Sequence, residues 1–140
     1  MRNQTKPNPI AKHARSWHAA WISLLLLSLL APLLRAEQFE LFTYSVNADN
    51  TVTITGYPDD ATGEVVIPAV IDGKAVTSIG VGAFSECFGL TSVTIPEGVT
   101  SIGTEAFKDC ASLTSVTIPS SVTSIERNAF SDCSSLASMT

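Results

Sequence analysis

A 23-residue repeat recurs without a gap in the later part of the chain. Residues 92–114 form one copy and residues 115–137 form the next. The copies share apolar or small residues and differ mainly at polar or charged positions. In a solenoid, inward positions are constrained by packing against neighbouring coils, whereas outward positions are not. The repeat therefore predicts a stacked solenoid. The matching positions are Val93/Val116, Ile95/Ile118, Pro96/Pro119, Val99/Val122, Ile102/Ile125, Ala106/Ala129, Phe107/Phe130, Cys110/Cys133 and Leu113/Leu136.

An earlier and longer copy of the repeat lies at residues 64–91. It keeps the same register but has about five additional residues between Pro68 and Val76. The dipeptide Asp72-Gly73 within this insertion predicts a tight turn between two short strands. We therefore expect coils at residues 64–91, 92–114 and 115–137, with residues 138–140 beginning a further coil.

Each coil is expected to contain two extended segments. In the second coil, Val93 and Ile95 alternate with hydroxyl residues, which predicts a strand that ends at Pro96. Residues 99–102 form a second, shorter extended segment. When such coils stack, like strands lie side by side. The predicted fold class is therefore a repeat solenoid, similar to leucine-rich repeats and built mainly from parallel β-strands.

The remaining part of each coil is expected to be one short helical turn. Residues 104–111 carry Ala106, Phe107 and Cys110 at helical spacing. Stacking should place the phenylalanines of successive coils on top of one another. The predicted column consists of Phe84, Phe107 and Phe130.

Residues 37–63 precede the first coil and predict a β-hairpin. Residues 42–46 and 52–54 each alternate between apolar and hydroxyl side chains, and residues 47–50 form a polar turn cluster. Residues 58–63 are a polar break before the first coil. Because the first coil of a solenoid exposes an apolar end, we expect residues 37–63 to form an N-terminal cap.

Residues 1–36 have the features of a secretory signal peptide. An uncharged apolar run at residues 19–34 follows a basic start. The run is short for a bilayer span but suits a signal peptide core. We expect cleavage before Glu37 and a secreted or cell-surface protein; an uncleaved signal anchor is the alternative. The basic residues are Arg2, Lys6, Lys12 and Arg15.

Charge is distributed unevenly along the chain. All 13 acidic residues lie at or after Glu37, where the basic residues are Lys74, Lys108 and Arg127. This segment therefore carries a net charge of about −10. Such a surface lacks the cluster of positive charge with which proteins bind nucleic acid or anionic lipid. We expect no nucleic-acid partner and no membrane contact beyond the signal segment.

The side chains of common catalytic and metal sites are scarce. The chain's two histidines, His13 and His18, lie within the predicted signal peptide, which removes His-dependent nucleophilic and metal arrangements from the mature chain. The pairs Asp49-Asn50 and Asp59-Asp60 are typical of turns and lack the pattern of a calcium loop. We therefore predict no enzyme activity and no cofactor, and we assign no catalytic, cofactor-binding or metal-binding residues.

The three cysteines follow the repeat. Cys87, Cys110 and Cys133 are each 23 residues apart, so each occupies the same position in its coil. An odd count and the absence of a C-x-x-C pair favour neither a disulfide framework nor a metal site. We expect buried, reduced thiols that act as small apolar fillers.

Three short motifs carry a family resemblance. They are L-T-S-V-T-I-P at residues 90–96, V-T-S-I-G at residues 99–103 and A-F-x-x-C-x-x-L at residues 106–113. The chain resembles the BspA-like leucine-rich repeat family of bacterial and protist surface proteins over residues 43–140. The resemblance implies a right-handed solenoid with a parallel sheet on its concave face. It also implies a secreted or surface location, with adhesion to host or matrix proteins in some members.

Two functional hypotheses follow. In the first, the chain is a non-catalytic adhesion scaffold that presents a flat strand face to an extracellular protein or glycan. In the second, it is the N-terminal structural fragment of a longer surface protein and has no binding activity of its own. Because residues 138–140 stop inside an expected strand, we also expect self-association through an uncapped C-terminal coil.

Overall fold

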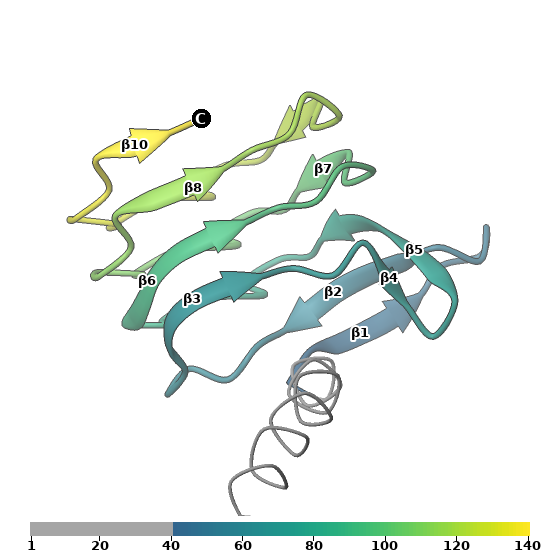
Figure 1. Ribbon diagram of the computed structural model, residues 1–140, viewed down its shortest axis with the longest axis horizontal. Helices are drawn as coiled ribbons and strands as arrows, with labels where there is room; N and C mark the ends of the chain where they lie inside the picture. The colour runs from purple at the N-terminus through teal and green to yellow at the C-terminus, as the bar shows by residue number, and fades with distance from the viewer. Residues whose placement is uncertain (1–40) are drawn as a thin grey trace, which may run out of the picture. The chain divides into compact units, whose positions relative to one another are not determined.

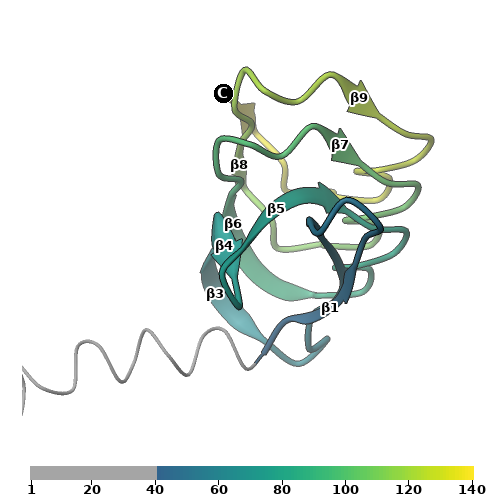
Figure 2. The same cartoon turned by 90° about the vertical axis from the view of Figure 1, so that its right-hand side faces the viewer.

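The computed structural model describes residues 41–140. The predicted signal peptide at residues 1–36 and the first four residues of the predicted cap lie outside this range. The described chain winds through ten strands that form a four-stranded sheet and a six-stranded sheet (Figure 1). In a side view of the stack, the two sheets occupy different sides of the coils, with β6 and β8 on the left and β7 and β9 on the right (Figure 2). Residues 41–140 contain no helix that is long and apolar enough to cross a membrane.

The four-stranded sheet is entirely parallel and has the order β10-β8-β6-β3. Ser92 of β6 pairs with Ser115 of β8, and Thr94 pairs with Thr117, so neighbouring strands are offset by one repeat. This register confirms the predicted parallel ladder. The strands are β3 (Thr62–Val66), β6 (Gly89–Thr94), β8 (Ser115–Thr117) and β10 (Ser138–Met139).

The six-stranded sheet has the order β1-β2-β5-β7-β9, with β4 paired to β5. The pairs from β2 to β9 are parallel, and Ser101 of β7 lies between Ser78 and Ser124 in the register. The second extended segment predicted for each coil is therefore present. The strands are β1 (Thr43–Val46), β2 (Val52–Gly56), β4 (Val70–Ile71), β5 (Lys74–Ile79), β7 (Ser101–Ile102) and β9 (Ser124–Ile125).

Two antiparallel hairpins flank the first coil. β1 pairs with β2 where the sequence predicts a hairpin, and the turn between them includes Asn50 at a φ of 65°. β4 pairs with β5 through Asp72 and Gly73, whose φ angles are 49° and 73°. Two successive positive φ angles are typical of the tight turn that a D-G pair favours. The turn predicted for the insertion is therefore confirmed.

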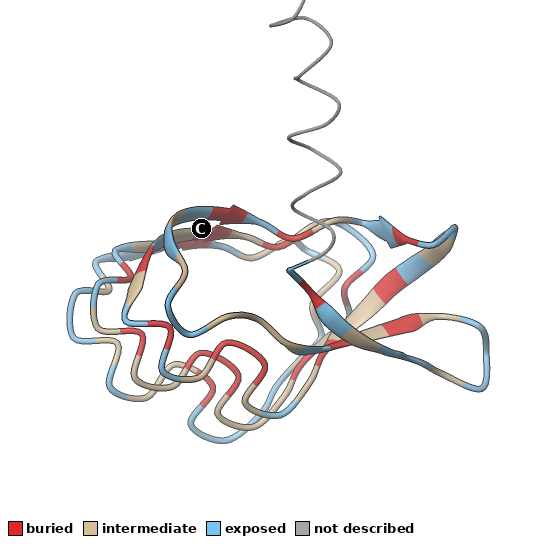
Figure 3. Ribbon diagram, turned by 90° about the horizontal axis from the view of Figure 1, so that it is seen from below, coloured by how far each residue is buried: buried red, intermediate tan, exposed pale blue. Residues whose placement is uncertain are grey.

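The core is a stack of apolar side chains inside the coil. Buried residues recur in successive coils (Figure 3). Val93 and Val116 point inward from β6 and β8 and are 1% exposed, while their strand neighbours point outward. Within the described residues, no polar or charged residue is buried. The solenoid is therefore stabilised by rows of like side chains that remove apolar surface from water.

The predicted phenylalanine column is present. The ring centroids of Phe84 and Phe107 lie 4.9 Å apart, and those of Phe107 and Phe130 lie 5.1 Å apart. Phe42 and Tyr57 approach Phe84 from the N-terminal side, with centroid distances of 6.3 Å and 5.2 Å. Aromatic side chains from the hairpin therefore cover the first ring of the column.

The helical turn predicted for residues 104–111 is wrong. Residues 104–109 form consecutive turns, because Glu105 and Asp109 have positive φ angles of 57° and 61° that no α-helix contains. The N–H groups of Glu105, Phe107 and Asp109 donate to carbonyl groups of the next coil, at residues 127, 129 and 131. Those of Ala106 and Lys108 donate three residues back. Stacking therefore satisfies the donors that a helix would use internally.

Candidate binding face

The acidic pairs that were weighed as calcium ligands form turns. An oxygen of the Asp49 carboxylate accepts hydrogen bonds from the backbone N–H and the hydroxyl of Thr51, at 3.1 Å and 2.7 Å. These bonds stabilise the charged form and lower the pKa of Asp49. Asp59 and Asp60 are exposed beside β3. Within residues 41–140, no three His, Cys, Asp or Glu side chains are grouped closely enough to hold a metal ion.

The cysteines lie inside the solenoid, as expected from their spacing. Cys87 and Cys110 are buried and Cys133 is partly buried. The Cys110 thiol donates to the carbonyl of Phe84 at 3.1 Å, and the Cys133 thiol donates to that of Phe107 at 3.0 Å. Burial raises the pKa of Cys87 to about 11 and that of Cys110 to about 12. A thiolate is the reactive form, so these residues are poor nucleophiles at neutral pH.

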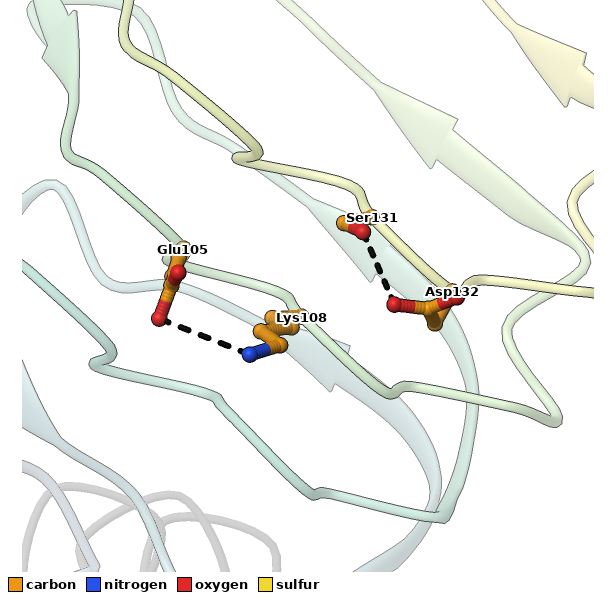
Figure 4. Close-up of polar contacts among 4 residues, drawn as sticks. All are labelled: Glu105, Lys108, Ser131 and Asp132. Carbon is orange, nitrogen blue, oxygen red and sulfur yellow. Dashed lines mark hydrogen bonds and ion pairs between the residues drawn. The ribbon is translucent and has the colours of Figure 1, made fainter.

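Charged side chains are concentrated in the turns and largely absent from the strands. Ten of the eleven acidic residues among residues 41–140 lie outside strands, and Glu64 of β3 is the exception. The turn segments carry exposed polar pairs, such as Lys108 with Glu105 at 3.8 Å and Ser131 with Asp132 at 2.8 Å (Figure 4). The exposed faces of the strands consequently carry few charged side chains, whereas the turns around them are acidic.

The hydroxyl groups of the six-stranded sheet bond within the protein. Ser101 donates to the hydroxyl of Ser78 at 3.0 Å, and Thr100 donates to the carbonyl of Thr77 at 3.2 Å. The same pattern continues one coil later, where Thr123 donates to the carbonyl of Thr100 at 3.3 Å. These three side chains connect successive coils, whereas Ser124 of β9 donates within its own coil to the Glu126 carboxylate at 3.0 Å.

The four-stranded sheet shares part of this pattern, because Thr114, just before β8, donates to the carbonyl of Thr91 of β6 at 2.9 Å. It differs in the strand residues that point outward. Within residues 41–140, no side-chain hydrogen bond joins the hydroxyls of Ser92, Thr94, Ser115 or Thr117 to another protein group, and all four side chains are exposed or partly exposed. Ser138 of β10 extends the serine row, and Glu64 and Val66 of β3 continue the rows at the other edge. We call Ser92, Thr94, Ser115 and Thr117 the hydroxyl face.

Sequence reasoning located this face only in part. Strand alternation showed that Ser92 and Thr94 point outward beside the buried Val93. It did not separate them from Ser101, which carries the same side chain on an equally outward position but bonds to the preceding coil. The available signal is the S-V-T triplet, which places two outward hydroxyls on one strand.

The family model described as "BspA type Leucine rich repeat region (6 copies)" matches residues 64–140. The chain belongs to the BspA-type leucine-rich repeat family. A search of curated proteins finds no match.

Solved structures of bacterial leucine-rich repeat proteins resemble the described fold. The T. pallidum Leucine Rich Repeat protein TpLRR is 33% identical, with a TM-score of 0.69 over 72% of this chain and 47% of that protein. A leucine rich cell surface protein from Faecalibacterium prausnitzii is 43% identical, with a TM-score of 0.61 over 69% of this chain. A leucine-rich repeat protein from Bacteroides ovatus is 35% identical, with a TM-score of 0.63 over 70% of this chain.

The chain spans only part of these proteins. It covers 47% of the T. pallidum protein and 27% of each of the other two. In repeat proteins of this kind, stacked coils provide a scaffold on which outward side chains vary.

Proposed function

We propose that this chain is a secreted or cell-surface scaffold, without catalytic activity, that binds an extracellular protein or glycan through the hydroxyl face. The observation that carries the proposal is a pair of rows of exposed or partly exposed hydroxyls on β6 and β8, formed by Ser92, Thr94, Ser115 and Thr117. The Ser101 hydroxyl of β7, in contrast, donates to Ser78 of the preceding coil. Function in repeat proteins is carried by outward positions, because inward ones are committed to packing.

Four further features support this proposal. The face is formed by stacked strands, which hold side chains more rigidly than loops do. Its strands pair without a register shift between β6 and β8, so the rows are regular. The similar protein from Faecalibacterium prausnitzii is described as a cell surface protein, and residues 1–36 have the features of a signal peptide.

The proposal is tested by binding to immobilised extracellular-matrix proteins and to a glycan array. The full chain is compared with two variants that each remove four exposed or partly exposed hydroxyls. The hydroxyl-face variant carries Ser92→Ala, Thr94→Val, Ser115→Ala and Thr117→Val. The control variant carries Thr43→Val, Ser45→Ala, Thr55→Val and Ser112→Ala, all at exposed positions.

We expect the parent and the control variant to bind at least one probe, and the hydroxyl-face variant to lose that binding. Circular dichroism of the variants confirms that each has folded. Equal binding by a folded hydroxyl-face variant would place the binding surface elsewhere, and binding to no probe would count against a binding role.

A second candidate function, that of a structural part of a longer protein, is favoured by the small share of the similar proteins that this chain spans. Because the chain spans 47% and 27% of two similar proteins, it can serve as the structural beginning of a longer array without its own ligand. Sequencing the gene beyond the codon for Thr140 decides this point. Further 23-residue copies would support the alternative, and an immediate stop codon would remove it.

We also infer that residues 37–63 act as the N-terminal cap. Phe42 is 6% exposed and packs against Tyr57 at a centroid distance of 4.9 Å, while Tyr57 covers Phe84. A Phe42→Ala substitution should therefore expose the first ring of the column and lower the unfolding free energy by about 3–5 kcal/mol. A loss below about 0.5 kcal/mol in urea unfolding would argue against the cap.

A further inference from the structure

We propose that Asp72 is a site of spontaneous covalent modification, at which its peptide bond to Gly73 rearranges to an isoaspartyl linkage, and that the Tyr44 hydroxyl restrains this reaction. The site is the turn between β4 and β5 and shares no residue with the hydroxyl face. Its chemistry therefore does not depend on the proposed binding role. The co-reactant is water.

The reaction proceeds through a cyclic imide. The backbone nitrogen of Gly73 loses its proton and forms a bond to Cγ of Asp72, while a carboxyl oxygen leaves as water. A second water molecule then opens the ring. When the bond between the nitrogen and the original carbonyl carbon of Asp72 breaks, the main chain continues through Cγ, and the former carbonyl becomes a carboxylate. One water is released and one is taken up, and no group is oxidised or reduced.

The residue that follows an aspartate decides how readily the ring closes. A side chain on that residue crowds the attacking nitrogen, and glycine has none. Among the Asp and Asn residues within residues 41–140, Asp72 is the one that precedes a glycine, so we expect ring closure to be fastest there. The others, each followed by a residue with a side chain, are Asn47, Asp49, Asn50, Asp59, Asp60, Asp109, Asn128 and Asp132.

The surroundings of Gly73 leave its nitrogen accessible. Asp72 and Gly73 are both exposed, and a Cβ placed at Gly73 would meet no atom within 4 Å. The paired residues nearest to the turn are Ile71 and Lys74. Within residues 41–140, the N–H of Gly73 between them donates no hydrogen bond. The attacking group is therefore held neither by an acceptor nor by packing.

The carboxyl group, in contrast, is held by a residue of the other hairpin. The hydroxyl of Tyr44 in β1 donates to Oδ2 of Asp72, and the partly buried Tyr44 side chain packs against the core. The same hydrogen bond raises the pKa of Tyr44, so the hydroxyl keeps its proton at neutral pH and remains a donor. Ring closure requires the Asp72 side chain and its backbone to rotate until Cγ reaches the Gly73 nitrogen. The bond to Tyr44 has to be released first, and it therefore slows the reaction.

The rearrangement changes the hairpin itself. It inserts a carbon atom into the main chain of a tight turn, whose length fixes the register of Ile71 with Lys74. It also draws the Asp72 carboxyl carbon into the main chain, so Tyr44 loses its present acceptor. The modified turn therefore cannot keep both the register of β4 with β5 and the contact with β1.

Ageing of the full chain tests the modification site. The parent and the Asp72→Glu variant are incubated for several weeks at physiological temperature and neutral pH. Peptides are then analysed by mass spectrometry with electron-transfer fragmentation, which distinguishes isoaspartate from aspartate. We expect isoaspartate to accumulate in the parent first at Asp72, and position 72 of Asp72→Glu to stay unmodified because the larger ring closes slowly. Absence of isoaspartate at Asp72, or its earlier appearance at Asp49, Asp59 or Asp60, would overturn the assignment.

A second pair of variants tests the restraint by Tyr44. Tyr44→Phe keeps the ring but removes the hydroxyl, and it should raise the rate at Asp72 by about two- to tenfold, the factor that corresponds to one hydrogen bond. Tyr57→Phe is the matched control, because Tyr57 is also partly buried in the predicted cap but is not the residue bonded to Asp72. It should leave the rate unchanged. Circular dichroism confirms that both variants have folded. An unchanged rate in folded Tyr44→Phe, or equal acceleration in both variants, would overturn the role of Tyr44.

Discussion

Phe107 and Phe130 lie with their rings parallel, at an interplanar angle of 1° and a centroid distance of 5.1 Å. Phe107 also stacks on Phe84 at 4.9 Å and is completely buried, whereas Phe130 is only partly buried. Phe107 therefore has a ring of the column on each side, whereas Phe130 stacks on Phe107 alone. The contribution of a repeat position to the unfolding free energy consequently depends on how many neighbouring coils its side chain contacts.

Replacing the enclosed ring should be costly. Phe107→Ala removes a buried aromatic side chain and leaves a cavity between two coils, so we expect the unfolding free energy to fall by about 3–5 kcal/mol. Phe88→Ala is the matched control, because Phe88 is 54% exposed, and it should change stability by less than about 0.5 kcal/mol. Urea unfolding followed by circular dichroism measures both. Similar losses in the two variants would contradict the stacked column.

The phenylalanine column could be predicted from the sequence because it is formed by a residue that recurs in every repeat. Phe84, Phe107 and Phe130 recur at the same position in each coil, and a recurring apolar residue in a repeat marks an inward position. The parallel ladders follow from the same reasoning. Neither conclusion required knowledge of which backbone groups bond to each other.

A second prediction concerns the partition of hydroxyls between the sheets. Ser101→Ala removes the donor of a bond to Ser78 that joins two coils, so it should lower the unfolding free energy by about 1 kcal/mol. Ser92→Ala makes the same chemical change at a partly exposed strand position without such a bond and should cost less than about 0.5 kcal/mol. The two variants are compared by the midpoints of their urea unfolding curves, provided that the m-values are equal. If Ser92→Ala is the more destabilising, the assignment of free and bonded hydroxyls is reversed.

That partition could not be read from the sequence. Ser92 and Ser101 both precede a buried aliphatic residue in an extended segment, so their patterns are equivalent. What separates them is whether a neighbouring coil places an acceptor within reach, which depends on the tertiary arrangement. The prediction of a helical turn at residues 104–111 was wrong for a related reason. The spacing of Phe107 and Cys110 suits a helix, but the backbone donors there bond to the next coil.

A third prediction concerns backbone conformation in the turn segment. Glu105 has a φ of 57°, a left-handed conformation that costs a residue other than glycine about 1–2 kcal/mol. Glycine at this position relieves that cost but adds about 0.4–1 kcal/mol of entropy to the unfolded chain. We therefore expect Glu105→Gly to leave stability unchanged or to raise it by up to about 1 kcal/mol.

Lys108→Gly is the control for this backbone effect. It breaks the same exposed ion pair, Lys108 with Glu105 at 3.8 Å, but Lys108 is not among the residues with positive φ. It should lower the unfolding free energy by about 0.4–1 kcal/mol, since only the entropic term remains. Thermal or urea unfolding compares the two variants. Equal destabilisation by both would show that the left-handed conformation at Glu105 carries no strain.

The last prediction concerns pH and the buried thiol of Cys110. Burial raises its pKa to about 12 in the folded protein, whereas an unfolded cysteine has a pKa of about 8.5. Between these two values the unfolded chain loses this proton and the folded chain keeps it. The unfolded state therefore binds fewer protons, and stability must fall as the pH rises through this range. Below a pH of about 8.5 the contribution of the thiol is fully present.

Comparing the parent with Cys110→Ala isolates this contribution, because all other titrating groups are common to both proteins. At about pH 7 the variant should be the less stable, since it loses the Sγ atom that fills the core and donates to the carbonyl of Phe84 at 3.1 Å. As the pH rises above about 8.5, the stability difference should narrow, at a limiting rate of about 1.4 kcal/mol per pH unit. Urea unfolding in the presence of a reductant, at about pH 7 and about pH 10, gives the two differences. A difference that stays constant would mean that the Cys110 thiol ionises in the folded solenoid as readily as it does in the unfolded chain.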